Sequence, residues 1–219
     1  MAPSSSSPPG ARPPSAPGAS SSSSASPPIV QVGAPVLRTR AADVAPERIA
    51  SDEIQTLITT MIASMRQAPG VGLAAPQIGV SLRVLVLEDR PELMAALSPD
   101  EIRERERVTV PVRVFINPVL RPIGDEKRTF FEGCLSAKGF TALVERHAEV
   151  EVTGLDERGQ PQTMRVRGWP ARILQHEVDH LDGTVYIDRM LSRSFSTIDQ
   201  AKARFGGKPI AEVRRLLGL

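Results

Sequence analysis

The first 28 residues set the strongest limit on what this chain can fold into. Met1–Pro28 contains 11 Ser, 8 Pro and a single charged side chain, Arg12. A segment of this composition cannot bury enough apolar surface to offset the entropy lost on ordering it. We therefore expect a disordered Ser/Pro-rich tail over Met1–Pro28. The remaining part, Ile29–Leu219, is long enough to form a single domain around one core.

Charge and hydropathy exclude several classes of protein. The net charge is only +2, so the sequence indicates no general binding of polyanions and no DNA partner. It contains no run of 18 apolar residues, and the tail has no apolar stretch typical of a secretory signal. A single cysteine, Cys134, excludes an intramolecular disulfide and favours a reducing compartment. We expect a cytoplasmic protein of a bacterium without membrane contact, and an organelle stays open as an alternative.

The pattern of apolar residues and breakers predicts short strands and a few helices. Helices are expected over Ser51–Gln67, from Gly168 to about Leu181, and over Ile210–Leu217. Strands are expected over Ile29–Val32, Arg83–Glu88, Val112–Ile116, Thr129–Phe131, Ala148–Thr153 and Thr163–Arg167, the last two as an antiparallel pair. The charged segment Asp89–Thr109 is expected to be a solvated insertion. This order of elements predicts an α+β fold with antiparallel sheets packed around a central helix.

That central helix carries two of the three histidines of the chain. His176 and His180 are four residues apart, so they lie one above the other on one helix face and can chelate one divalent ion. Glu177 lies between them in sequence. Trp169 and Ile173 extend the same face and can form an apolar wall beside a metal. Asp179 is expected on the surface, with hydrogen bonding to a ligand imidazole as the alternative.

The third ligand decides the class of metal site, and two candidates exist. Downstream, only Glu212 could complete a peptidase-like site, and it lies in the expected terminal helix. Upstream, Glu132–Ser136 (EGCLS) contains Cys134, the only thiol of the chain. One thiolate and two imidazoles form a site whose fourth position stays open for water.

Three segments together resemble the peptide deformylase family. They are Gly70–Gln77 (GVGLAAPQ), Glu132–Ser136 (EGCLS) and Gln175–His180 (QHEVDH), and they follow the order and spacing of that family's motifs. The similarity extends over about Val30–Arg189. The residues after Ser136, the Asp89–Thr109 insertion and the tail depart from the family pattern.

The resemblance implies a role for each site residue. It makes Cys134, His176 and His180 the metal ligands and Glu177 the general acid and base. The Gln77 side chain and the Leu135 backbone N–H become donors to an oxyanion. The substrate-binding residues that we expect are Val71, Gly72, Gly133, Trp169 and Ile173.

The resemblance also implies an activity and partners. The expected enzyme removes the formyl group from the formyl-methionine of new polypeptides with one divalent metal ion, Fe²⁺ by preference, which Zn²⁺, Ni²⁺ or Co²⁺ can replace. Seven basic residues against two acidic ones in Arg189–Leu219 suggest contact with ribosomal RNA. Two alternatives stay open: a peptidase that uses Glu212, and a deformylase-like protein that binds metal or ribosome without turnover.

Overall fold

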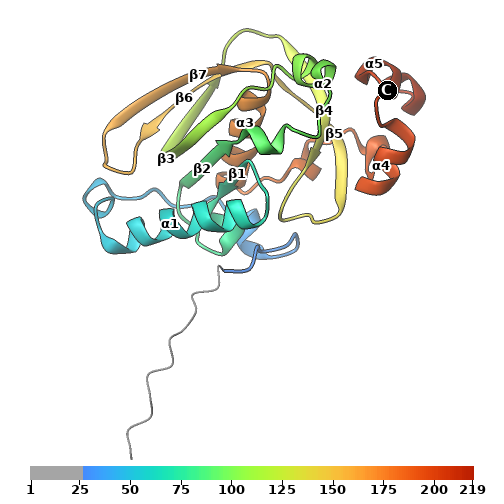
Figure 1. Cartoon of the computed structure of the whole chain (residues 1–219). Coiled ribbons are helices and arrows are strands. Elements are labelled where there is room, and N and C mark those ends of the chain that lie inside the picture. Colours follow the sequence, from blue (N-terminus) through green and yellow to red (C-terminus); the bar gives the residue numbers. More distant parts are fainter. Residues whose placement is uncertain (1–26) are drawn as a thin grey trace, which may run out of the picture.

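Two antiparallel sheets flank helix α3 (Trp169–Leu181) in the computed structural model, which describes residues 27–219 (Figure 1). The larger sheet has the strand order β1-β2-β3-β6-β7 and the smaller one β4-β5-β8. The strands are β1 (Gly72–Ala74), β2 (Val84–Asp89), β3 (Val110–Pro122), β4 (Lys127–Gly133), β5 (Phe140–His147), β6 (Glu149–Leu155), β7 (Pro161–Arg167) and β8 (Ser196–Thr197). The other helices are α1 (Asp52–Gln67), α2 (Pro99–Glu104), α4 (Ile198–Phe205) and α5 (Ile210–Leu217).

Strand β2 is buried on both faces because the larger sheet lies between two helices. Val84 and Val86 point into one core with the apolar face of α1, whose first turn is capped by the Ser51 side chain. Leu85 and Leu87 point to the opposite face and pack with α3. The alternation of side chains along a strand therefore joins α1, the sheet and α3 into one stack.

The smaller sheet is covered by the C-terminal helices. Leu143 of β5 packs with Phe205 of α4 and with Val213 and Leu217 of α5. Figure 1 shows α4 and α5 beside β4 and β5, on the side away from α1. This arrangement leaves the end of β4 directed toward α3, where the motif histidines lie.

The predicted fold class, α+β with antiparallel sheets, is confirmed, and so are most of the helices and strands. The helix expected over Ser51–Gln67 begins one residue later, because Ser51 is its cap. The expected hairpin corresponds to β6 and β7. The expected terminal helix, Ile210–Leu217, is α5.

Two predictions of local structure were wrong, and some elements were missed. Ile29–Val32 forms no strand, because its hydrogen bonds go to two separate loops. The strand expected to end before Asn117 continues to Pro122, since Asn117 adopts a φ of 52° and the pairing with β6 shifts register at this bulge. Strand β5 and helix α4 were not predicted at all.

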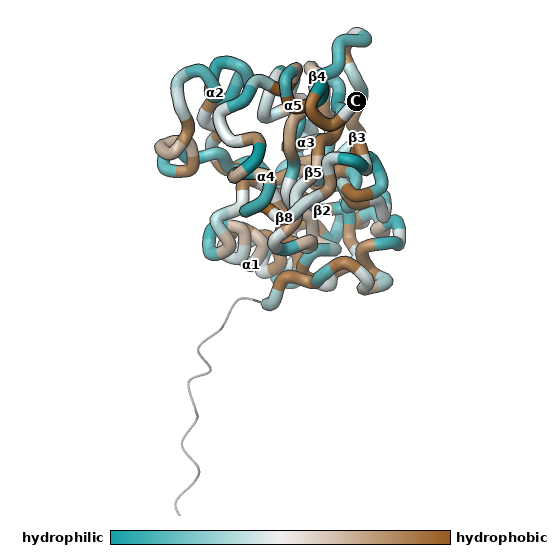
Figure 2. Tube along the Cα trace, turned by 90° about the vertical axis from the view of Figure 1, so that its right-hand side faces the viewer, coloured by the Kyte–Doolittle hydropathy of each residue, from teal (hydrophilic) through white to brown (hydrophobic). Residues whose placement is uncertain are grey.

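The tail predicted over Met1–Pro28 lies outside the described residues except for Pro27 and Pro28. Within residues 27–219, no helix has the length and apolar character that a membrane span requires. Figure 2 shows that hydrophilic residues prevail along much of α2, which belongs to the insertion.

Candidate metal centre and active site

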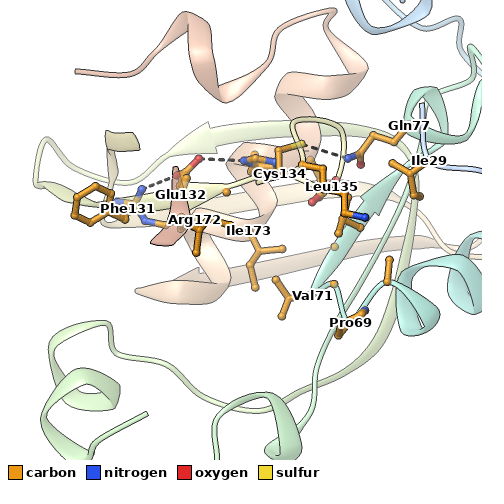
Figure 3. A pocket seen from close by; sticks show the side chains of 18 of the residues that line it. Ile29, Pro69, Val71, Gln77, Phe131, Glu132, Cys134, Leu135, Arg172 and Ile173 are labelled. Carbon is orange, nitrogen blue, oxygen red and sulfur yellow. Dashed lines mark hydrogen bonds and ion pairs between the residues drawn. The ribbon is translucent and has the colours of Figure 1, made fainter. Parts of the chain in front are cut away.

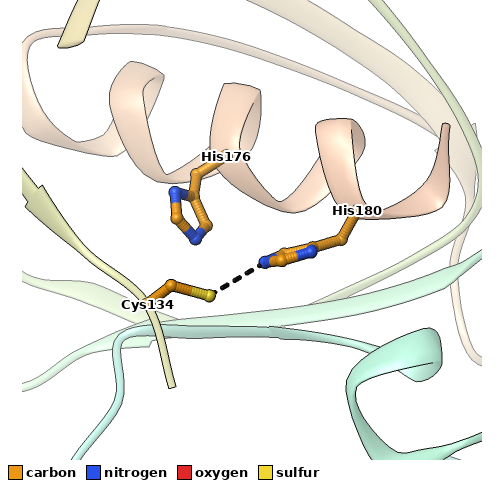
Figure 4. Close-up of side chains that lie close together, drawn as sticks. All are labelled: Cys134, His176 and His180. Carbon is orange, nitrogen blue, oxygen red and sulfur yellow. Dashed lines mark hydrogen bonds between the residues drawn. The ribbon is translucent and has the colours of Figure 1, made fainter. Parts of the chain in front are cut away.

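Three potential metal ligands meet between β4 and α3. Cys134 directly follows the last residue of β4, and His176 and His180 lie one turn apart on α3. The thiol and one nitrogen of each ring all lie within 4.8 Å of one another. Cys134 Sγ is 3.2 Å from His180 Nε2 (Figure 4). The fold thus assembles the group that the sequence analysis selected, from segments 42 residues apart.

The surroundings of these three residues favour a positive charge among them. Burial lowers the pKa of His180 well below its usual range, so this ring is neutral, as a metal ligand must be. Burial would also lower the pKa of His176, but hydrogen bonds with Cys134 and Glu132 hold it well above its usual range. A divalent ion would supply that positive charge as a proton does. The residues present therefore fit a metal with thiolate and imidazole ligands.

Glu132 orients His176, although Glu132 was not among the predicted site residues. Its Oε2 lies 3.0 Å from His176 Nδ1, which leaves Nε2 directed toward Cys134 (Figure 4). Burial would raise the pKa of Glu132, but the ion pair with Arg146 holds it well below its usual range. Arg146 approaches both carboxylate oxygens, at 2.7 and 2.9 Å, and Arg172 approaches one at 2.5 Å. The position of Glu132 in the EGCLS motif, two residues before Cys134, was the signal in the sequence that could have identified it.

Asp179 occupies neither of its two expected places. It is only 7% exposed, and it forms no hydrogen bond with an imidazole in the described part of the chain. Its Oδ2 accepts from Arg146 Nη1 at 2.7 Å, and both its oxygens accept from Arg189 at 2.7 Å. Asp179 and Glu132 therefore share Arg146, and this buried network joins α3 to β4 and β5.

Glu177 lies against β1, where a glycine makes room for it. A methyl group on Gly72 would come within 2.8 Å of Glu177 Cγ and Cδ, and closer still to Oε1. Burial raises the pKa of Glu177 to about 7, and the positive charges of His176 and Arg146 limit that rise. Such a carboxyl group can both accept and donate a proton near neutral pH.

Gln77 and Leu135 lie on the two loops beside the thiol. Gln77 belongs to the short 3₁₀ turn Ala75–Ile78 and is 1% exposed. Its Oε1 accepts the Ala74 N–H at 2.8 Å, which directs Nε2 toward Cys134 Sγ at 3.6 Å (Figure 3). Leu135 follows Cys134 in the turn after β4. Both predicted donors are thus brought to the thiol.

A cavity of about 800 Å³ opens beside this group (Figure 3). All five residues predicted for substrate binding line it: Val71, Gly72, Gly133, Trp169 and Ile173. Glu177 and His176 line it as well, so the cavity reaches the candidate ligands. Its other walls include Phe131 and Arg172, which were not among the predicted site residues.

The insertion also contributes to this cavity, so its prediction as merely solvated was wrong. Arg107 lines the cavity, and its guanidinium group is held by the buried carboxylate of Asp89 at 2.8 and 2.9 Å. The guanidinium carbons of Arg105 and Arg107 lie 5.0 and 5.6 Å from the centre of the Trp169 ring. The chain before β3 therefore forms part of the wall.

The alternative third ligand is not brought to the histidines. Glu212 lies on α5, where its carboxylate pairs with Lys208 at 2.9 Å. Among residues 27–219, the donor group around the two histidines is completed by Cys134. The peptidase alternative therefore lacks the third metal ligand that it requires.

Comparison with known proteins gives consistent matches. A family model described as polypeptide deformylase matches residues 26–195. The chain is 51% identical to the chloroplastic peptide deformylase 1A of Solanum lycopersicum, over 79% of this chain and 62% of that protein. It is 48% identical to peptide deformylase 1 of Streptomyces coelicolor, over 83% of this chain and 81% of that protein. A Met-Ala-Ser-bound crystal structure of a class I type b peptide deformylase from Acinetobacter baumannii matches with a TM-score of 0.68 at 34% identity, covering 76% of this chain and 99% of that one.

These matches include every segment of the site. The range of the family model runs from before Ile29 to beyond His180, and so contains all three motifs. The chain spans less than two thirds of the length of the Solanum lycopersicum relative but about four fifths of the Streptomyces coelicolor one. This chain belongs to the peptide deformylase family.

Proposed function

We propose that this chain is a metal-dependent hydrolase that removes the formyl group from the N-terminal formyl-methionine of newly synthesised polypeptides. The observation that carries the proposal is the convergence of Cys134, His176 and His180 beside a cavity that Cys134, His176 and Glu177 line. The Acinetobacter baumannii relative was solved with Met-Ala-Ser bound. That tripeptide is what removal of formyl from formyl-Met-Ala-Ser would leave.

In this proposal Cys134, His176 and His180 hold one divalent ion. The ion supplies Lewis acidity, which lowers the pKa of water toward about 7 and so makes a nucleophile available at neutral pH. Glu132 fixes the orientation of His176 through its Nδ1 atom. The family resemblance makes Fe²⁺ the ion that we propose, and Zn²⁺, Ni²⁺ or Co²⁺ could replace it because all of these accept imidazole and thiolate ligands.

Glu177 moves the proton in this reaction. Its carboxylate takes a proton from the attacking water and later gives it to the amine nitrogen as the bond to the formyl carbon breaks. The pKa of about 7 that burial gives Glu177 suits both steps. Formate and a free methionine N-terminus are the products.

Gln77 and Leu135 stabilise the negative charge that develops on the formyl oxygen. The Gln77 amide is buried and held by Ala74, so its Nε2 keeps one direction before the substrate arrives. Neither an amide side chain nor a backbone N–H titrates near neutral pH. Loss of one such donor in comparable sites costs about 3–4 kcal/mol of transition-state stabilisation.

The methionine side chain occupies the apolar part of the cavity. Val71, Trp169 and Ile173 form its wall, and Gly72 and Gly133 allow the substrate backbone to approach the edges of β1 and β4. Formyl carries only hydrogen on its carbon, so a close fit at Gly72 and Glu177 excludes acetyl by size.

The test is an assay on matched substrates in the absence of oxygen. Protein stripped with chelator and reloaded with Fe²⁺ should release formate from formyl-Met-Ala-Ser and should leave acetyl-Met-Ala-Ser intact. The same protein without metal should release nothing. Cleavage of an internal peptide bond would identify a peptidase instead. Stoichiometric metal without formate release would identify a non-enzymatic binding protein.

The partner that we propose beyond the substrate is ribosomal RNA. Lys202 and Arg204 on α4 and Arg215 on α5 are exposed basic residues of the two C-terminal helices. Such a surface would bring the enzyme to new chains with a strongly salt-dependent affinity. The compartment that we propose is the bacterial cytoplasm, although relatives of this chain include both a chloroplastic and a bacterial protein.

A further inference from the structure

The segment Val30–Val32 joins the two loops that flank the thiol. The Val30 N–H donates to the backbone oxygen of Gln77 at 2.8 Å. The Val32 N–H donates to the backbone oxygen of Ser136 at 2.7 Å. One short piece of chain, more than 40 residues away in sequence from either loop, therefore fixes their separation.

Between these two anchors, the side chain of Gln31 reaches into the turn that follows Cys134. Gln31 Nε2 donates to the backbone oxygen of Leu135 at 3.0 Å, and also to that of Ile29 at 3.2 Å. Its Oε1 accepts the Lys138 N–H at 3.3 Å. The amide group of Gln31 thus spans the turn and supplies hydrogen bonds to two of its backbone groups, the Leu135 oxygen and the Lys138 N–H.

The carbonyl held by Gln31 belongs to the same peptide group whose N–H faces the thiol. This is the peptide between Leu135 and Ser136, and its Ser136 N–H donates to Cys134 Sγ at 3.3 Å. Gln31 and the sulfur atom therefore lie on opposite sides of one planar unit. A donor on the carbonyl side polarises the peptide and strengthens the N–H···S bond on the other side.

We infer that Gln31 is a positioning residue for the metal site. It holds the Leu135–Ser136 peptide so that its N–H supports the Cys134 thiolate, and it fixes the adjoining turn that carries the Leu135 N–H. The inference rests on the proposed function, because it assigns the thiolate to a metal. Hydrogen bonds to a ligating sulfur tune the retention and the electronic properties of the metal.

The experiment compares Gln31→Ala and Gln31→Glu with Gln200→Ala, a control at an exposed position on α4. Each protein is loaded with Co²⁺, and three quantities are measured: the sulfur-to-cobalt absorption band, the rate of Co²⁺ release to a chelator, and kcat and KM on formyl-Met-Ala-Ser. Glu at position 31 keeps the acceptor for the Lys138 N–H but loses the donor to Leu135. Both Gln31 variants should therefore shift the band, release Co²⁺ about 3–10-fold faster and lower kcat by a similar factor with KM nearly unchanged.

The outcomes separate this inference from the proposed function. An unchanged band and an unchanged release rate in Gln31→Ala would overturn the inference. If the wild-type protein binds Co²⁺ but releases no formate, the proposed function fails, and the band and the release rate still decide the role of Gln31. Because Gln31 is exposed, its variants should unfold at the wild-type temperature, which distinguishes a local effect on the site from a general loss of stability.

Discussion

At the scale of single residues, the site depends on the absence of a side chain at Gly72. Gly72 leaves the space into which Glu177 extends, and a methyl group there would overlap the carboxylate. We predict that Gly72→Ala displaces Glu177 and lowers kcat about 10²-fold, as expected for a misplacement of about 1 Å. Metal content should stay at one equivalent, because the atoms nearest to this methyl group belong to Glu177 and not to one of the three ligands. Wild-type kcat in this variant, measured by formate release, would show that catalysis does not require Glu177 in this position.

At the scale of elements, the buried carboxylate of Glu132 holds β4, β5 and α3 together. It pairs with Arg146 and Arg172 and orients His176. We predict that Glu132→Gln lowers the free energy of unfolding by about 3–5 kcal/mol, since it leaves buried guanidinium groups without their partner. It should also weaken metal binding about 10–100-fold. Urea unfolding of the apoprotein and a metal titration measure the two effects separately.

The matched control for this prediction is an exposed ion pair on the same two strands. Lys127 of β4 and Glu145 of β5 are diagonal neighbours whose charged groups lie 3.6 Å apart, and both side chains are about half exposed. Glu145→Gln should leave stability and metal affinity nearly unchanged, because exposed pairs contribute little. Equal effects of Glu132→Gln and Glu145→Gln would mean that the buried network has no special role.

The elements also show what the sequence could and could not predict. Helix α1 and the helix with the two histidines have local signals, namely a cap, a stop and a repeat of apolar residues. Strand β3 was predicted too short, because nothing local indicates that Asn117 adopts a positive φ and lets the strand continue past it. Strand β5 lacks a clear alternation of apolar and polar residues, since side chains on both faces of the strand are buried.

The same division holds within the site. Cys134, His176, Glu177 and His180 lie in short motifs with recognisable spacing. The contacts of Glu132 bring together residues 14, 40 and 44 positions away, and no pattern in one sequence predicts such pairs. Arg107 was missed for the same reason: its role comes from packing beside Trp169, within a segment whose charges resemble those of a solvated loop.

At the scale of the whole molecule, the site lies between two sheets and is closed by segments distant in sequence. Ile29, close to the start of the described residues, lines the cavity. We predict that deletion of Met1–Pro28 leaves kcat/KM for a tripeptide unchanged, because the composition of this segment cannot support packing against the domain. A kcat/KM reduced more than about threefold, which corresponds to a loss of about 0.7 kcal/mol of transition-state stabilisation, would contradict that prediction.

The central claim is that a metal held by Cys134, His176 and His180 acts together with Glu177 to release formate. The most direct measurement is an anaerobic titration of the apoprotein with Co²⁺, in which bound metal and formate release from formyl-Met-Ala-Ser are determined on the same samples for wild type and Glu177→Gln. Both proteins should bind one equivalent. The wild-type rate should rise to a plateau at that equivalent, and the variant should be slower by at least about 10²-fold. Loss of metal binding in Glu177→Gln, or formate release by the wild type that does not depend on Co²⁺, would contradict the account.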